Sequence, residues 1–306
     1  MNRVAADIGG TNSRFAWLGD GETTVREYRN ADFSDLCQVI ARFLDEEGKP
    51  TVKIERMVLA LPAPVEQRPV RLTNIDWRVD PQSLQQKFPI QELSLVNDFQ
   101  AAAVGAINAS SPRRLNPAAP HASAGPAVVA GAGTGLGQAW FADISRDELP
   151  RATEGGHADF APQGAQQREL QAWLEQRHGG HVSCERLLSG GGLAAIHEFL
   201  GGAALDAAAV EQGARAGDAT AVEAVQMFVS IFGAHAGNLA LLSNPAAGIH
   251  LCGGVVAHLA DWFDDGFLES YSNKGRMRHK VEGIPVYLHD RADIGMQGAI
   301  QIALQG

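Results

Sequence analysis

Three short strand-like runs, separated by turn residues, open the chain. They cover residues 4–8 (VAADI), 13–18 (SRFAWL) and 23–28 (TTVREY). Short runs that are bounded by turn residues are typical of neighbouring strands. The sequence therefore predicts a three-stranded meander at the start of the fold.

The apolar spacing then changes from strand-like to helical. In the segment 34–48, apolar residues follow the i, i+3, i+4, i+7, i+8 pattern of one helical face. These residues are Leu36, Val39, Ile40, Phe43 and Leu44. We expect Ser34 to cap this helix and Gly48 to end it.

Strands and helices alternate over the rest of the first hundred residues. The pattern predicts a buried strand at 57–61, a short helix begun by Asp80 and Pro81, a strand at 92–97 and a helix from Asp98. The predicted order is βββαβαβα, which indicates an α/β fold.

A similar pattern starts again in the second half. Residues 109–126 are rich in alanine, serine and proline, which is typical of a surface connection. Residues 126–141 (PAVVAGAGTGLGQAWF) then resemble the start of the chain at an offset of 124 residues, with Asp7 aligned to Gly131. We interpret this similarity as an internal duplication of a βββαβα unit.

The second copy is longer because it carries a largely helical insertion. The elements predicted after the repeat are a helical stretch at 163–243, a strand at 248–252, a helix at 255–265, a strand at 285–289 and a helix from Asp293.

We expect two lobes with a central cleft between them. The small α/β lobe would cover residues 1–108 and be completed by the C-terminal helix at 293–306. The large α/β lobe would cover residues 109–292. A chain of 306 residues exceeds what one compact core usually organises, which supports this division.

Charge and cysteine content exclude several classes of protein. The formal net charge is -10, from 25 Lys and Arg against 35 Asp and Glu, which disfavours binding to nucleic acid or to an anionic membrane. The three cysteines are far apart and form no CxxC pair, so we expect the reducing cytoplasm rather than a disulfide framework. Asp7 interrupts the first apolar run, and no window reaches about 18 apolar residues without a polar break, so we expect neither an export signal nor a membrane span.

The turn after the first strand could hold phosphate. It reads Asp7-Ile8-Gly9-Gly10-Thr11-Asn12, and paired glycines expose backbone N–H groups with no side chain in the way. An ordinary hairpin turn is the alternative for the glycines alone. An acid inside an apolar strand favours the first interpretation, because Asp7 could hold the hydration shell of Mg²⁺ beside a polyphosphate.

A second glycine turn occupies the corresponding place in the second copy. It contains Gly131, Gly133, Thr134, Gly135 and Gly137, and it fits neither the Walker A pattern nor GxGxxG before a helix. Alone it predicts only a flexible hairpin. Two such turns in duplicated units would face each other across a cleft and could embrace one nucleotide polyphosphate.

Asn97 and Asp98 lie where a strand ends and a helix begins. Ligands usually bind at this edge of the sheet in open α/β folds. Asp98 could serve only as the N-cap of the helix. In a phosphoryl-transfer enzyme, the same carboxylate could accept the proton of an attacking hydroxyl as a general base.

Glu154, His157 and Glu185 supply groups that hydrogen-bond sugar hydroxyls well. A metal site is the alternative. Glu-x-x-His can ligate iron from a helix, but it needs a second copy, and the glycines between these residues disfavour a helix. His178, His181 and Cys184 have tolerable zinc spacing, but no fourth ligand is evident nearby.

Gly253 and Gly254 follow the predicted strand at 248–252 and precede a helix. The backbone there could approach a flat adenine or ribose closely, or the glycines could serve tight strand-to-helix packing. The sequence leaves both interpretations open.

Taken in order, these motifs resemble those of the bacterial ATP-dependent glucokinases. The motifs are DIGGTN at 7–12, LVNDF at 95–99, GAGTGLG at 131–137, EGGHADFAP at 154–162, HVSCERLLSG at 181–190, and GNLAL with LCGGVV within 237–256. The resemblance covers nearly the whole chain. It implies the actin-like ATPase (ribonuclease H-like) fold of hexokinases, a glucose site between the lobes, ATP with Mg²⁺, and a homodimer.

The resemblance also implies roles for individual residues. The catalytic base falls on Asp98. Sugar-binding groups fall on Asn97, Asp98, Glu154, His157 and Glu185. Nucleotide-binding positions are Asp7, Gly9, Gly10, Thr11, Asn12, Gly131, Gly133, Thr134, Gly135, Gly253 and Gly254, with Mg²⁺ near Asp7 through water.

Two departures from the family pattern concern zinc and the sugar. A related repressor and kinase family carries a cysteine-rich zinc motif before the equivalent of Glu185, whereas here only Cys184 is present, which indicates the zinc-free branch. Residues 61–77 match the family loosely, and Gly191-Gly192 stands where proline is common.

The resemblance predicts ATP-dependent phosphorylation of glucose to glucose 6-phosphate. A kinase for fructose or mannose is the nearest alternative. A sugar sensor without catalysis is less favoured, because it would need a DNA-binding module and the chain begins directly with the first strand.

Overall fold

A computed structural model describes residues 2–19, 21, 23–73, 75–146 and 148–305. The chain divides into two compact units. Unit 1 contains Met1–Asn108 and Asp293–Gly306, and unit 2 contains Ala109–Ala292. Each unit is an α/β structure built around its own mixed sheet.

The sheet of unit 1 has five strands in the order β3-β2-β1-β4-β7. Their bounds are β1 Arg3–Ile8, β2 Asn12–Leu18, β3 Thr24–Arg29, β4 Ile54–Leu61 and β7 Ile90–Asn97. The first three form the predicted antiparallel meander, and β1, β4 and β7 run parallel. Asp7 is in register with Ala60, and Leu61 with Asn97, so the turn after β1 and the end of β7 lie at the same edge of the sheet.

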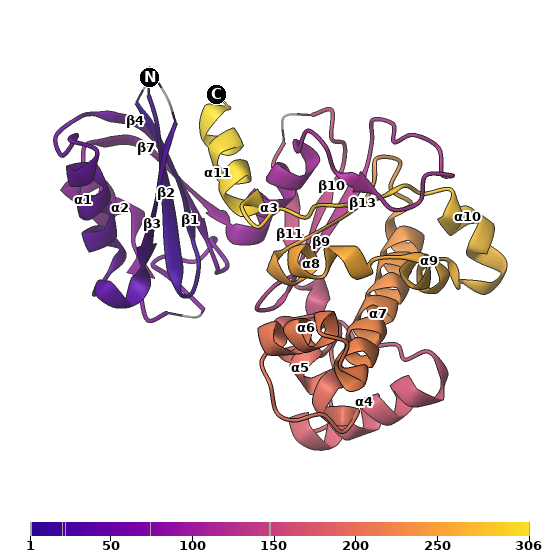
Figure 1. Ribbon diagram of the computed structural model, residues 1–306. Helices are drawn as coiled ribbons and strands as arrows, with labels where there is room; N and C mark the ends of the chain where they lie inside the picture. The colour runs from indigo at the N-terminus through magenta and orange to yellow at the C-terminus, as the bar shows by residue number, and fades with distance from the viewer. Residues whose placement is uncertain (1, 20, 22, 74, 147, 306) are drawn as a thin grey trace. The chain divides into compact units, whose positions relative to one another are not determined.

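Helices cover both faces of this sheet, as Figure 1 shows. The helices α1 (Leu36–Glu46) and α2 (Pro81–Lys87) lie on one face, and α3 (Asp98–Ile107) and α11 (Ile294–Leu304) lie on the other. The predicted apolar face of α1 is buried in the core. A short 3-10 helix, η1 (Asn30–Asp32), follows β3, and a small hairpin, β5 (Val70–Arg71) with β6 (Arg78–Val79), precedes α2.

The predicted cap of α1 is wrong by one residue. Asp35, not Ser34, is the N-cap, because its carboxylate accepts the Gln38 N–H at 2.9 Å. Gln38 in turn accepts the Ser34 N–H at 3.0 Å, so Ser34 takes part through its backbone alone. Gly48 has φ +67, the left-handed conformation that ends helices, as predicted.

The helices α3 and α11 of unit 1 approach each other at glycines. A Cβ on Gly298 of α11 would lie 1.7 Å from the carbonyl oxygen of Ala101, and one on Gly105 of α3 would lie 2.1 Å from that of Ile294. Since no side chain fits at such distances, the backbones of α3 and α11 are in direct contact. The first turn of α11 is thereby held next to the end of β1.

The sheet of unit 2 repeats the topology of unit 1 in the order β11-β10-β9-β12-β13-β8. Its strands are β8 Arg113–Arg114, β9 Ala127–Ala132, β10 Leu136–Phe141, β11 Arg151–Thr153, β12 Gly248–Cys252 and β13 Val286–Leu288. Again three antiparallel strands precede parallel ones. Both β9 and β10 begin 124 residues after β1 and β2, which is the offset of the sequence repeat.

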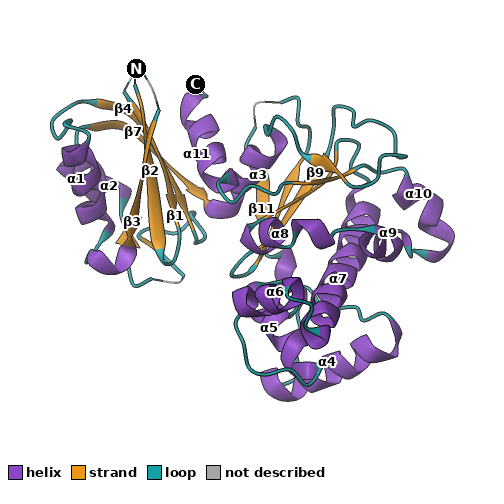
Figure 2. Ribbon diagram, in the orientation of Figure 1, coloured by secondary structure: helices purple, strands orange, loops and turns teal. Residues whose placement is uncertain are grey.

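Most of unit 2 outside the sheet is helical (Figure 2). The helices are α4 Gly164–His178, α5 Gly190–Phe199, α6 Ala207–Arg215, α7 Ala219–Ser243, α8 Gly254–His258, α9 Asp265–Ser272 and α10 Arg278–Glu282, with 3-10 turns η2 Gly155–His157, η3 Cys184–Arg186, η4 Ala260–Trp262 and η5 Gly275–Met277. Helix α7 is long and apolar enough to cross a membrane, but 72% of its apolar window is buried inside the protein, as in a core helix.

The single helix predicted at 255–265 is wrong. Helix α8 ends at His258, and Phe263 has a non-helical φ of -80 and ψ of 80. A new helix, α9, then begins after Asp264, whose side chain accepts the Gly266 N–H at 2.9 Å.

Candidate active site

The first glycine turn, Gly9 to Asn12, joins β1 to β2 and is built tightly. The N–H of Gly9 donates to the carbonyl oxygen of Asn12 at 2.8 Å. A Cβ on Gly9 would lie only 2.9 Å from that oxygen, so a larger residue would open the turn. Position 9 must therefore be glycine, and no side chain covers the backbone of the turn there.

Asp7 lies just before this turn, opposite Arg14 in the β1–β2 register. The side chain is half-buried, and burial raises the pKa of its carboxyl group, while the charge of Arg14 opposes that shift. A Cβ on Gly295 would lie 2.9 Å from Oδ2 of Asp7, so glycine at this position lets the first turn of α11 approach the carboxylate closely.

The surroundings of Asp7 fit the predicted magnesium role. Mg²⁺ keeps several waters and usually takes one or two protein carboxylates together with substrate phosphates. A single carboxylate next to the first glycine turn is compatible with that requirement. Among the described residues, no group of three or more His, Cys, Asp or Glu is arranged to hold a metal without a substrate.

Glu27 of β3 was not singled out from the sequence, yet it organises this end of β2. Its Oε2 accepts from Nε of Arg14 at 2.8 Å, and its Oε1 accepts from Nδ2 of Asn12 at 2.8 Å. One carboxylate thus holds both a residue of the turn and the cation that faces Asp7. Arg14 and Glu27 are neighbours in the β2–β3 register, a pairing that depends on strand alignment.

Asn97 and Asp98 occupy the junction between β7 and α3. The helix cap is Asn97, since its Oδ1 accepts the Phe99 N–H at 2.9 Å and Gln100 accepts the Asn97 N–H at 3.0 Å. The interpretation of Asp98 as N-cap is therefore wrong, and Asp98 is the first residue of the helix. Its Oδ1 also accepts from the Phe99 N–H, at 2.8 Å.

The second glycine turn, Gly133 to Gly135, joins β9 to β10 and is tied to Glu185. The N–H of Leu136 donates to Oε2 of Glu185 at 2.9 Å. A Cβ on Gly135 would lie 2.5 Å from the same oxygen, so only glycine lets the carboxylate come so close. The N–H of Gly190, at the start of α5, donates to the carbonyl oxygen of Gly133 at 2.9 Å.

The three predicted sugar ligands of unit 2 converge on His157. Its Nε2 lies 3.7 Å from Oε2 of Glu154, and its Nδ1 lies 3.9 Å from Oε1 of Glu185. The Glu154 side chain is 82% exposed and the Glu185 side chain 31%, so both carboxylates reach solvent. Residues 154 and 185 are thus brought together around one imidazole, and their sugar-binding role stays a prediction.

The glycines between Glu154 and His157 explain how this turn packs. A Cβ on Gly156 would lie 2.1 Å from the carbonyl oxygen of Leu136, and one on Gly155 would lie 2.2 Å from Oε1 of Gln138. The turn η2 therefore rests directly on β10. Any side chain at either position would lift Glu154 and His157 away from the sheet.

Gln138 supports the turn from behind and was not singled out from the sequence. It is buried, and its Nε2 donates to Nε2 of His235 on α7 at 2.7 Å. Burial, aided by the charge of Lys274, lowers the pKa of His235 to about 4. His235 is therefore neutral at physiological pH and can accept this hydrogen bond.

The two glycines after β12 have different reasons to be glycine. Gly253 has φ +101, and its Cβ would lie 2.4 Å from the carbonyl oxygen of Ala132, so it serves tight packing. A Cβ on Gly254 would meet no atom within 4 Å, so the backbone there borders open space. The packing interpretation therefore applies to Gly253, and the approach of a nucleotide to Gly254 stays a prediction.

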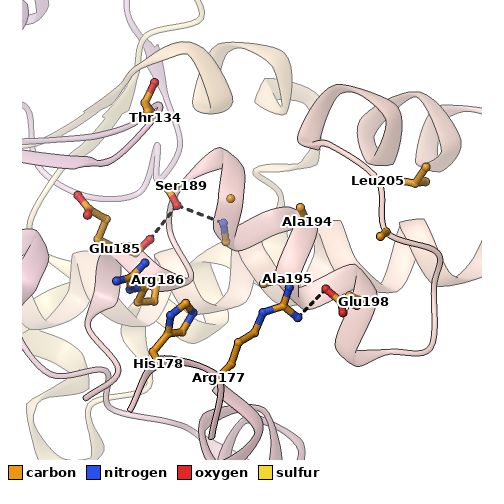
Figure 3. A pocket seen from close by; sticks show the side chains of 13 residues that line it. Thr134, Arg177, His178, Glu185, Arg186, Ser189, Ala194, Ala195, Glu198 and Leu205 are labelled. Atoms are coloured by element: carbon orange, nitrogen blue, oxygen red, sulfur yellow. Dashed lines mark hydrogen bonds and ion pairs between the residues drawn. The ribbon is translucent and has the colours of Figure 1, made fainter. Parts of the chain in front are cut away.

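A cavity of about 420 Å³ in unit 2 adjoins the second glycine turn (Figure 3). Thr134, Glu185 and Ser189 line the cavity from one side of Figure 3, and Leu205 lies on the other side. Ala204, next to Leu205 in the chain, also lines the cavity. The lining thus combines a polar end that carries hydroxyl groups with an end that includes apolar side chains.

This cavity is also lined by three basic side chains, those of Arg177, His178 and Arg186. Arg177 is paired with Glu198 at 2.7 Å. Ser189 caps α5 by accepting the Gly192 N–H at 3.1 Å, which aims the positive end of the helix at the polar end of the cavity. Glu185 and Glu198 line the cavity as well, so its charges are mixed, and the start of α5 is the feature that favours an anionic group.

The zinc alternative has no support in the geometry of Cys184. Burial raises the pKa of its thiol to about 11, and Sγ donates to the carbonyl oxygen of Asp159 at 3.5 Å. His181 pairs with the carboxylate of Asp159 at 2.9 Å instead of turning to the sulfur. A thiol held protonated in this way is a poor metal ligand.

Comparison with known proteins agrees with these motifs. The chain matches the glucokinase family over residues 4–306. A glucokinase of Marinobacter nauticus is 34% identical over 310 residues, covering 97% of this chain and 96% of the relative. A glucokinase of Nostoc punctiforme is 32% identical over 334 residues, covering 97% of each chain.

Solved structures give the same result for the fold. A glucokinase from an Antarctic psychrotroph has a TM-score of 0.84 at 28% identity, covering 100% of this chain and 99% of the other. A ROK family glucokinase of Streptomyces griseus, solved with glucose and AMPPNP, has a TM-score of 0.67 at 20% identity, with 100% of both chains covered. The predicted actin-like α/β fold class is confirmed, and the full-length match shows that this chain is a member of the glucokinase family.

Proposed function

We propose that this chain transfers the γ-phosphoryl group of ATP to the 6-hydroxyl of glucose. Membership of the glucokinase family supports the reaction, and the structural observation that carries the proposal is the convergence of Glu154, His157 and Glu185. Two carboxylates on either side of an imidazole match a ring of sugar hydroxyls, because each carboxylate accepts hydrogen bonds and the imidazole can donate one.

Asp98 is the proposed general base. In phosphoryl transfer, a carboxylate within reach of the acceptor hydroxyl orients it and takes its proton as the new bond forms. Asp98 follows β7 directly and begins a helix that Asn97 and Gln100 cap, so its backbone is held rigidly. A rigid base suits a reaction that depends on positioning. Asn97, whose Nδ2 donates to the carbonyl oxygen of Ala63 at 3.3 Å, would add a sugar contact beside it.

The two glycine turns are the proposed phosphate-binding elements. The N–H groups of Gly9 and Gly133 donate to Asn12 and Gly135 inside the turns, so the other backbone N–H groups of Gly9 to Asn12 and of Gly133 to Gly135 would bind phosphate oxygens. Thr134 would add a hydroxyl donor. Fixed donors aimed at the transferred group stabilise charge that develops during transfer. When bound, Mg²⁺ would neutralise phosphate charge, held near Asp7 through water.

The cavity in unit 2 is the proposed site for the rest of the nucleotide. Its polar end adjoins Thr134 and the capped start of α5, which suits phosphate. Its apolar end, with Ala204 and Leu205, suits a flat base. Gly254, which borders open space, would let a ribose or base approach the backbone closely.

Initial rates with MgATP and a panel of hexoses test the proposal. We expect glucose to give the highest kcat/KM. A higher kcat/KM for fructose or mannose would keep the phosphoryl-transfer reaction but change the preferred acceptor. These sugars are the relevant comparison because the chain departs from the family pattern at 61–77 and at Gly191. Sugar binding without turnover on any hexose would instead indicate a sensor.

We further propose a cytoplasmic homodimer, the state that the family resemblance implies. Cys37, Cys184 and Cys252 are free thiols, which suits a reducing compartment. Light scattering at micromolar concentration should give the mass of two chains. A mass of about 32.5 kDa would contradict the dimer.

A further inference from the structure

Asn30 is buried next to the first glycine turn, although it belongs to none of the motifs described above. It is 2% exposed and begins η1, immediately after β3. A buried amide must satisfy both its donor and its acceptor, because each unpaired polar group costs stability. The partners of Asn30 are therefore informative.

Those partners hold the turn from one side. The side-chain Nδ2 donates to the carbonyl oxygen of Gly9 at 2.8 Å, and the backbone N–H donates to the carbonyl oxygen of Thr11 at 2.8 Å. The hydroxyl of Ser13, itself fully buried, donates to Oδ1 at 2.6 Å. Rotating the amide by half a turn would set Oδ1 against the oxygen of Gly9, so the observed orientation is the one that the contacts allow.

Fixing a carbonyl also fixes the next amide. The peptide between Gly9 and Gly10 is trans, so its C=O and N–H point in opposite directions. With the oxygen of Gly9 turned toward Asn30, the N–H of Gly10 points away from Asn30. Asn30 thereby sets the direction of an amide in a turn that the proposed function assigns to phosphate binding.

We infer that Asn30 is a positioning residue for nucleotide phosphate, acting through the carbonyl oxygens of Gly9 and Thr11. The inference rests on the proposed function, because it takes the first glycine turn to bind the phosphates of ATP. It predicts that loss of the Nδ2 donor weakens ATP binding and leaves glucose binding unchanged.

A purely structural role makes a different prediction. Destabilisation alone lowers the fraction of folded enzyme, which reduces the apparent kcat at fixed protein but does not change either KM. Ser13→Ala is the matched control, since it leaves Oδ1 of Asn30 without its donor but keeps the bond to Gly9. This variant should lower Tm while the KM for MgATP stays within twofold of wild type.

The test uses Asn30→Ala and the similarly sized Asn30→Leu, assayed well below the Tm of each variant. Both variants remove the donor to Gly9, and agreement between them separates that loss from the change in side-chain volume. We expect the KM for MgATP to rise about tenfold in both, with the KM for glucose within twofold of wild type. An unchanged KM for MgATP in both variants, or an equal rise in the two KM values, would overturn the inference.

Calorimetric titration of MgATP separates this inference from the proposed reaction. If wild-type enzyme binds MgATP but phosphorylates no hexose, the proposed reaction fails, and the Kd of the Asn30 variants still decides the role of Asn30. A Kd about tenfold weaker than wild type supports the positioning role. An equal Kd removes it.

Discussion

Oε2 of Glu185 occupies the space that a side chain on Gly135 would need, 2.5 Å from the position of its Cβ. The same oxygen accepts the N–H of Leu136 at 2.9 Å, so the carboxylate is fixed by the second glycine turn. The proposed phosphate turn and the proposed sugar site of unit 2 therefore share this contact. A change in one should affect the other.

Gly135→Ala should weaken glucose binding with little loss of stability. The methyl group would force Glu185 to swing away, which a side-chain end can do at small structural cost, but the carboxylate would leave Leu136 and His157. We expect the Kd for glucose, measured by calorimetry, to rise about tenfold.

The matched variant for that experiment is Gly133→Ala in the same turn. Its Cβ would meet no atom within 4 Å, so Glu185 should stay in place. The Kd for glucose should then remain within twofold of wild type. Equal weakening in both variants would show that the effect comes from the turn in general and not from Glu185.

Asp98→Asn should fold normally and lower kcat by about 10³ or more. The amide keeps the shape of the carboxylate but cannot take the proton of the sugar hydroxyl, so the Kd for glucose should change far less. Asp80→Asn is the control, because Asp80 caps α2 in the same unit and asparagine caps equally well. A variant that keeps more than about a tenth of the wild-type kcat would remove Asp98 from the role of base.

Glu154→Gln should weaken glucose binding by about 1 to 3 kcal/mol, with a smaller effect on kcat. Glutamine still accepts through its oxygen, but it presents an N–H₂ donor where a sugar hydroxyl donates. Glu169→Gln, an exposed change on α4 of the same unit, is the matched control. Isothermal titration with glucose measures both, and an unchanged Kd in Glu154→Gln would place that residue outside the sugar site.

Local patterns were sufficient to predict most of the fold. The apolar faces of β1, β2 and α1 repeat within a few residues, so the periodicity of the sequence carries them. The strands β8 and β11 were missed because Arg113–Arg114 and Arg151–Thr153 show no apolar alternation. They are strands because neighbouring strands offer them backbone partners, which the local sequence does not reveal.

The residues of the candidate site also fall into a group that local sequence motifs indicate and a group that they do not. Residues in glycine-rich or acidic motifs could be found from the sequence, since such motifs have a direct chemical reason. Asn30, Glu27 and Gln138 could not, because their importance lies in partners that are distant along the chain. Gln138 and His235, for instance, are separated by 97 residues, and only the fold brings them to 2.7 Å.

Buried histidines should make the protein less stable as pH falls below about 6.5, the usual pKa of histidine. His250 of β12 and His289 share a hydrogen bond of 3.1 Å, and Nε2 of His250 lies 3.3 Å from the carbonyl oxygen of Ala247. If Nε2 carries the proton, Nδ1 of neutral His250 accepts from His289. Protonating Nδ1 would set two N–H groups against each other.

Burial lowers the pKa of His250 to about 3, aided by His289, and lowers the pKa of His289 and of His235 to about 4. Between pH 6.5 and 4, the unfolded chain therefore binds protons that the native state does not, and each such histidine costs about 1.4 kcal/mol of stability per pH unit. Above pH 6.5 all three are neutral in both states and this cost is absent. His250→Phe keeps the stacking on Tyr287 at 4.8 Å but removes one site. In urea unfolding between pH 7.5 and 5, the free energy of unfolding should fall less steeply with pH in this variant, by the slope that corresponds to about one bound proton. Equal slopes in the variant and the wild type would contradict the neutral state of buried His250.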